Sequence, residues 1–209
     1  MHEEVLMELV RRLPRRMTAV SAWPLWSLPR RLLAYILSII AADLAAIGLA
    51  ASFTTITGAN LALFGLLLGC TAISVELTRK AGEQGGMIKD VQGVWELPAA
   101  VLLPPLYALL VPIVRIALLQ FRIRRAPVYR RVFSAAAIGL AYGAASVTFH
   151  GLYGLMPHGP GGMLSRGTVW TLVMAACVLV KEVVNKTVVI TAVKSADPAT
   201  SIRTEVFGR

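Results

Sequence analysis

The sequence is poor in charge, because charged residues fill only 15% of its 209 positions, and acidic residues are the scarcer kind, with 11 Asp and Glu against 21 Lys and Arg. A typical soluble domain carries about 25% charged residues. The shortage argues against an ordinary water-soluble fold. Hydrophobic residues make up 56% of the chain and the mean hydropathy is +0.69, which favours a membrane protein with several spans.

Cysteine is also scarce, since Cys70 and Cys177 are the only two and both lie in apolar runs. We expect two buried thiols and no disulfide framework. The first residues, MHEEVLMELVRRLPRRM, lack the basic-then-apolar order of a cleavable signal peptide. The first apolar run is therefore expected to act as an uncleaved anchor.

Common catalytic and cofactor motifs are missing from the sequence. It contains no phosphate-binding loop and no HExxH, GxSxG or dinucleotide-binding pattern. His150 and His158 lie eight residues apart without further ligands nearby, which makes a poor metal or haem site. ELTR, at 76–79, resembles part of an intramembrane protease motif, but its acidic and histidine partners are missing. We therefore expect a protein without enzymatic activity, cofactor or metal.

Long apolar runs dominate what is present. Each run is long enough to cross a hydrocarbon core about 30 Å thick. The predicted fold is an all-α, polytopic transmembrane helical bundle, with four clear spans over about 32–53, 56–77, 132–156 and 168–193. Its predicted parts are a cytoplasmic amphipathic and basic segment over 1–31, a transmembrane helical domain over 32–193, and a polar tail over 194–209.

A fifth apolar stretch, WELPAAVLLPPLYALLVPIVRIALLQFRIRR, is broken by Pro104 and Pro105. Proline lacks an N–H, and the residue before a proline disfavours the helical conformation. The legs at 97–103 and 106–120 reach only about 10 and 22 Å as helices. The stretch either turns back, as a re-entrant hairpin or two short helices, or crosses once as a helix kinked at proline.

Arginines lie beside the apolar runs, which is typical of topology signals and anionic-lipid contacts and not of nucleic-acid binding. One cluster precedes the first run and a second follows Pro112: Arg11, Arg12, Arg15, Arg16, Arg30 and Arg31, then Arg115, Arg122, Arg124, Arg125, Arg130 and Arg131. The positive-inside rule predicts a multi-pass protein of the cell membrane with a cytoplasmic N-terminus. A turn at Pro104 and Pro105 keeps both clusters on that side, which favours the turn-back.

Polar residues in the apolar runs are the candidate functional residues, because ionisable groups are costly in lipid. The candidates are Asp43, Arg115, Lys181, Glu182, Asn185 and Lys186. Spacing of four residues allows Lys181 to pair with Asn185, and Glu182 with Lys186. Asp43 can pair with a buried basic residue such as Arg115. Alternatively, the last four candidates lie at the membrane surface, with lysines extending to the headgroups.

Two GxxxG pairs favour close helix packing: Gly65 with Gly69, and Gly139 with Gly143. Alanines flank the second pair on both sides, so its face is predicted to contact helices more than lipid. The same small-residue faces can also join two copies of the chain in a homodimer.

Three phrases, ISVELTRKAGE, the proline-broken stretch and YRRVFSAAAIGLAYGAASVTFHGL, together resemble a known family region. This is the N-terminal multi-span region of actinobacterial membrane signalling proteins, where it precedes a cytoplasmic GGDEF-type (diguanylate cyclase-like) domain. The resemblance covers about residues 70–195. It implies a sensory or anchoring module that regulates or localises a cytoplasmic signalling output, although no GGDEF sequence follows here. The alternative is a small-molecule transporter or membrane substrate-binding component, because broken helices form ligand sites in transporters.

Overall fold

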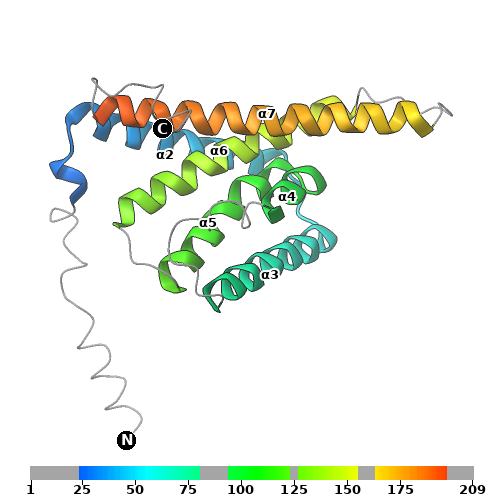
Figure 1. The fold of residues 1–209 in the computed structure, drawn as a ribbon, viewed down its shortest axis with the longest axis horizontal. Coiled ribbons are helices and arrows are strands. Elements are labelled where there is room, and N and C mark those ends of the chain that lie inside the picture. The colour runs from blue at the N-terminus through cyan, green and yellow to red at the C-terminus, as the bar shows by residue number, and fades with distance from the viewer. Residues whose placement is uncertain (1–23, 81–93, 123–126, 155–162, 197–209) are drawn as a thin grey trace, which may run out of the picture.

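The computed structural model describes residues 24–80, 94–122, 127–154 and 163–196, and it has a helical architecture throughout these ranges (Figure 1). This confirms the predicted all-α fold. The elements are η3 (Pro24–Ser27), α2 (Arg30–Phe53), α3 (Gly58–Lys80), α4 (Glu96–Leu102), α5 (Pro105–Arg122), α6 (Val128–Tyr153) and α7 (Met163–Ala196). Most of the predicted amphipathic and basic segment (1–23), Arg124, Arg125, His158 and most of the polar tail lie outside the described residues.

Among the described helices, α2, α3, α6 and α7 are long and apolar enough to cross a membrane. They coincide with the four predicted spans, so the chain is a multi-pass membrane protein. Helix α7 has 34 residues and is therefore about 51 Å long. This length exceeds a hydrocarbon core of about 30 Å, so part of α7 extends beyond the apolar layer.

The proline-broken stretch forms two separate helices, α4 and α5. Leu103 between them is extended, with φ −117° and ψ 155°, a conformation that the residue before a proline prefers. Pro105 is the first residue of α5, a position at which a missing N–H removes no helical hydrogen bond. The break at Pro104 and Pro105 is therefore a true helix end.

An ion pair shows that this stretch folds back on itself. Arg115 Nε, in α5, lies 2.7 Å from Glu96 Oε1, at the start of α4. In one continuous helix these two residues would be about 28 Å apart along the axis, which their side chains cannot span. One long helix kinked at proline is therefore wrong for this stretch, which folds back on itself as two helices.

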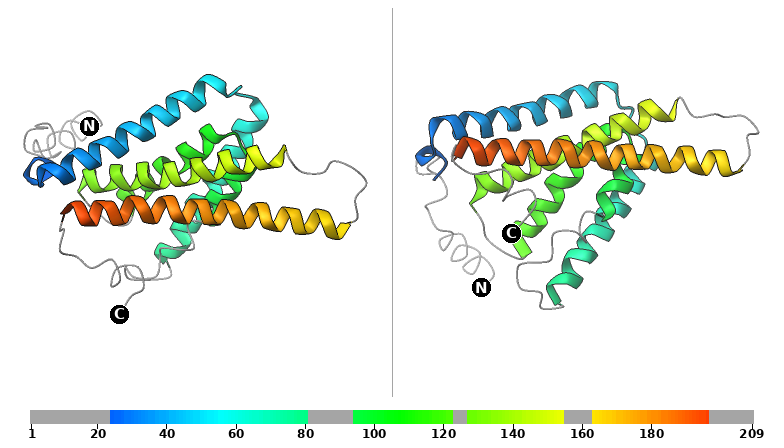
Figure 2. Two further views of the ribbon diagram at one scale, coloured as in Figure 1. Left: turned by 90° about the horizontal axis from the view of Figure 1, so that it is seen from above. Right: turned by 45° about the horizontal axis from the view of Figure 1, so that its top comes forward.

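Helix α6 is the centre of the assembly, where it packs against α2, α4, α5 and α7. In its apolar window 56% of the residues are buried, against 11% for α2 and 17% for α3, so the outer helices present most of their surface to lipid. Helices α2 and α6 begin, and α7 ends, on the same side of the assembly (left in Figure 1 and in both views of Figure 2). Helix α3 diverges from these three and packs on α4 and α5.

The two GxxxG pairs have different surroundings. A Cβ at Gly143 would lie 2.5 Å from Leu109 Cδ2, and one at Gly139 would lie 3.1 Å from the Leu109 carbonyl oxygen. These two glycines let α5 approach α6 closely. A Cβ at Gly65 or Gly69 would meet nothing within 4 Å. The prediction of close packing is wrong for this pair within the chain, because their face of α3 points away from the bundle.

Candidate functional site

Buried charges meet where α4, α5, α6 and α7 pack together. Glu96 is 1% exposed and Arg115 is 8% exposed, so neither group reaches solvent or lipid headgroups. Their ion pair joins α4 to α5, and the Nε–H of Arg115 is not directed at the nearby oxygen, so the 2.7 Å contact is electrostatic and not an aligned hydrogen bond. Ions removed from water in this way depend on each other for stability.

Tyr142 brings α6 into the same site. Its hydroxyl donates a hydrogen bond to the Glu96 carboxylate, and its ring is buried against Ala100 of α4 and Ala108 of α5. The carboxylate of Glu96 thus lies between a guanidinium from α5 and a phenol from α6. Three helices meet at this one acidic group.

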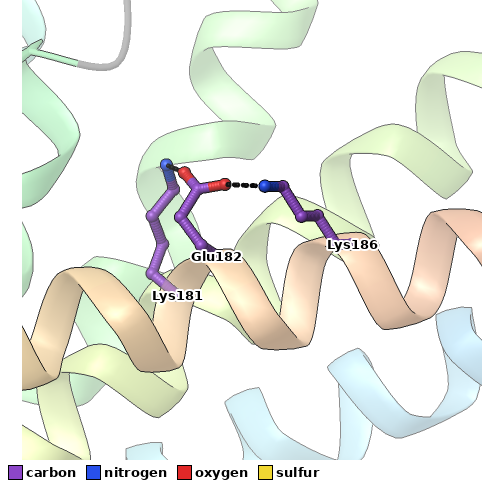
Figure 3. A network of polar contacts seen from close by, with 3 residues as sticks. All are labelled: Lys181, Glu182 and Lys186. Carbon is purple, nitrogen blue, oxygen red and sulfur yellow. Dashed lines mark hydrogen bonds and ion pairs between the residues drawn. The ribbon is translucent and has the colours of Figure 1, made fainter. Parts of the chain in front are cut away.

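Lys181 and Glu182 extend the site to α7. Lys181 Nζ lies 5.6 Å from the centre of the Tyr142 ring, a cation–π distance. The same ammonium donates a hydrogen bond to Glu182 Oε1 at 2.5 Å, and Lys186 Nζ lies 3.9 Å from Glu182 Oε2 (Figure 3). The ion pair expected between Glu182 and Lys186 is thus present, whereas Lys181 contacts Glu182 rather than Asn185, which is half-buried on the same helix.

The charges alternate in sign along this series of contacts. Lys181 pairs directly with Glu182 and also acts electrostatically on Glu96, more weakly than Arg115 does. We call Arg115, Glu96, Tyr142, Lys181 and Glu182 the polar network. Lys186 lies at its outer end, with a side chain that is 61% exposed. The network crosses the bundle from α5 to α7, so a displacement of any of these helices changes its ion pairs.

Asp43 is outside the polar network. The predicted pairing of Asp43 with Arg115 is wrong, because Arg115 contacts Glu96 instead. Asp43 is 4% exposed and faces Gly139, where a Cβ would lie 2.8 Å from its Oδ1. Helix α2 therefore places this carboxyl against the glycine face of α6.

Sequence reasoning missed Glu96 and Tyr142. Glu96 stands at the start of the proline-broken stretch but is not among the predicted candidates, and Tyr142 lies in a run of alanine and glycine. A signal for Glu96 exists, because a hairpin that turns at Pro104 and Pro105 brings residues nearly equidistant from the turn to the same level. Glu96 and Arg115 are such residues, and their charges are opposite.

Metal ligands do not gather in the part of the chain that the structure covers, where no three His, Cys, Asp or Glu side chains lie close enough to hold an ion. His150 uses its Nδ1 for a 2.8 Å contact with the Ser146 carbonyl oxygen of its own helix. The Cys177 thiol is buried against Ala145 and Phe149 of α6.

No protein-family model matches the chain. Comparison with curated proteins and with solved structures finds no match either. The resemblance to the membrane region of GGDEF-type signalling proteins remains a prediction. Function has to be inferred from the polar network and from the helices that it joins.

Proposed function

We propose that this chain is an integral membrane sensory or anchoring module that regulates or localises a cytoplasmic signalling output, with the polar network as its relay. The observation that carries the proposal is the series of alternating charges that joins α4, α5, α6 and α7. A change in the packing of α4 on α5 would move the Glu96 carboxylate. Because Lys181 interacts with that carboxylate, the change would be transmitted to α7.

The energetics of buried charge support a role beyond stability. Well-packed hydrophobic residues of similar volume often stabilise a fold as well as a buried ion pair does, or better. Lys181 is bonded to Glu182 in the present arrangement, lies against the Tyr142 ring, and also acts electrostatically on Glu96. An element with two arrangements of similar energy is what a switching transition requires.

The length of α7 supports transmission along the bundle. Lys181 and Glu182 lie near the middle of α7, and about 20 Å of helix separates them from Ala196. A continuous helix carries a rotation or shift at Lys181 to its own end. That end lies on the side where α2 and α6 begin (Figure 2), which is the predicted cytoplasmic side.

The relay is tested by measuring how the ends of α2 and α7 move. Cysteines replace Arg31 and Ala196, which are both exposed, and each carries a spin label. The background is Cys70→Ala. Cys177 is fully buried and is expected to stay unlabelled. In lipid nanodiscs, Glu96→Gln is expected to shift or broaden the distance distribution between the labels. Lys186→Gln, at the exposed end of the network, is the matched control and should leave it unchanged. A folded Glu96→Gln protein with the wild-type distribution would overturn the relay.

A transporter or substrate-binding component is the second candidate, and the helix break between α4 and α5 favours it. Transporters place ligand sites at discontinuous helices, and Arg115 lies on one of the two helices that this break separates. The test is thermal unfolding of the purified protein with a panel of carboxylate, phosphate and amine metabolites. A ligand at 100 times its Kd would stabilise the protein by about 2.7 kcal/mol. Stabilisation that Arg115→Gln abolishes would favour transport over the relay.

A further inference from the structure

Asp43 is a buried carboxyl that has no partner in the described bundle. It lies in the middle of α2, is 4% exposed, and its Oδ1 makes no hydrogen bond to any described residue. A carboxylate removed from water without a cation or donor is destabilised so strongly that such groups usually take up a proton instead. The surroundings of Asp43 therefore determine its charge.

Two acceptor oxygens converge above Gly139. A point at the Cβ position of Gly139 would lie 2.8 Å from Asp43 Oδ1 and 3.1 Å from the backbone carbonyl oxygen of Leu109 in α5. A charged carboxylate facing a carbonyl oxygen meets lone pairs only, which repel it. A protonated carboxyl in the same place has an O–H that the carbonyl accepts.

The cations of the neighbouring helices are occupied by other acids. On α5, Arg115 pairs with Glu96, and on α6 the Tyr142 hydroxyl donates to that same carboxylate. On α7, Lys181 and Lys186 both pair with Glu182. The buried and half-buried cations Arg115 and Lys181 are thus engaged with Glu96 and Glu182, and no described residue forms an ion pair with Asp43.

We propose that Asp43 is a proton-binding site, held as the neutral acid at neutral pH, whose O–H donates to the Leu109 carbonyl oxygen and ties α2 to α5 across Gly139. The ligand of this site is a proton. Gly139 has no side chain, so it leaves room for the Asp43 carboxyl and the Leu109 carbonyl oxygen to lie beside each other. Loss of the proton replaces an attraction between α2 and α5 with a repulsion. The site does not depend on the proposed signalling role, because no member of the polar network takes part in it.

Infrared difference spectroscopy tests the site directly. The spectrum of the full chain in lipid at pH 7 is compared with that of Asp43→Asn, whose amide is the neutral isostere and can donate an N–H to the same carbonyl. The wild type is expected to show the C=O stretch of a protonated carboxylic acid, which the variant lacks. Raising the pH should convert this band to carboxylate bands in the wild type alone.

Glu182→Gln is the matched control, because Glu182 is paired with two cations, Lys181 and Lys186. Its difference spectrum at pH 7 should show the loss of carboxylate bands and no loss of an acid band. Carboxylate bands in the Asp43→Asn difference at pH 7 would overturn the proposal. Failure of Asp43→Asn to insert and fold would also overturn it, since a neutral donor in this place is what the proposal requires.

Discussion

Helices α3 and α6 both span the membrane and both carry a GxxxG pair, yet they occupy opposite positions in the fold. In α6, Gly139 and Gly143 receive Asp43 and Leu109 at distances that leave no room for a Cβ. In α3, Gly65 and Gly69 face open space within the chain. The motif permits close approach, but a neighbouring helix has to be present to use it. Buried ions, close packing and the helix hairpin all gather on the α6 side.

The largest expected difference between the two sides concerns buried charge. Glu96→Gln leaves Arg115 without a countercharge next to α6 and should destabilise the protein by about 3–5 kcal/mol. Ser74→Ala on α3 is the matched change, because it removes the neutral hydrogen bond from Trp95 Nε1 at 2.8 Å. That loss should be about 1 kcal/mol. Unfolding in detergent measures both losses of stability. Equal losses would contradict the expectation that the contacts around α6 contribute more to stability than those of α3.

The next largest effect is expected at Gly139, the glycine whose added methyl would press on backbone. In Gly139→Ala the added methyl meets a backbone carbonyl oxygen, which cannot move aside without shifting α5. Overpacking of this kind costs about 1–3 kcal/mol. Gly65→Ala is the control on α3, and since its Cβ meets nothing within 4 Å, helix propensity alone should make it neutral or stabilising by up to about 1 kcal/mol. If Gly139→Ala were as stable as Gly65→Ala, the packing difference between the GxxxG pairs of α6 and α3 would have no effect on stability.

A smaller loss is expected for Gly143→Ala. Its Cβ would lie 2.5 Å from the end of the Leu109 side chain, and a leucine can change rotamer where a carbonyl cannot move. The cost should therefore be about 1 kcal/mol, at the lower end of the range for overpacking. Thermal unfolding of the two alanine variants side by side measures the order. A larger loss for Gly143→Ala than for Gly139→Ala would mean that Leu109 is held rigidly.

The smallest effect is expected for Lys186→Gln, at the exposed end of the polar network. Its 3.9 Å contact with Glu182 involves a side chain that is 61% exposed, and exposed ion pairs contribute about 0–1 kcal/mol. The stability loss should lie in that range and shrink further with added salt. A loss as large as that of Glu96→Gln would place Lys186 in the buried part of the network.

Much of the architecture could be predicted from the sequence, because apolar length alone marks a membrane span. The hairpin could also be predicted, since Pro104 and Pro105 end a helix and the arginine clusters favour a return. The pairing of charges could not. Asp43 and Arg115 are both charged residues in apolar runs, so the sequence allows them to pair, but packing decides which helices are neighbours and pairs Arg115 with Glu96.

The GxxxG spacing alone does not show which glycine pair packs against another helix. Both pairs read alike in sequence, although alanines flank Gly139 and Gly143 and large leucines flank Gly65. Small neighbours let a second helix approach, and leucines cover the groove with side chains that suit lipid. The composition around a GxxxG pair therefore carries information that the spacing lacks.

The ion pair between α4 and α5 also determines how this stretch can enter the bilayer during synthesis. Helix α4 has seven residues and cannot hold itself in the hydrocarbon, while a lone arginine at the depth of a helix centre costs about 2.5–3.5 kcal/mol to insert. Joined through Glu96 and Arg115, the two helices present neither unpaired charge to lipid. We therefore expect the hairpin to enter as one unit, with α6 following to supply the Tyr142 hydroxyl.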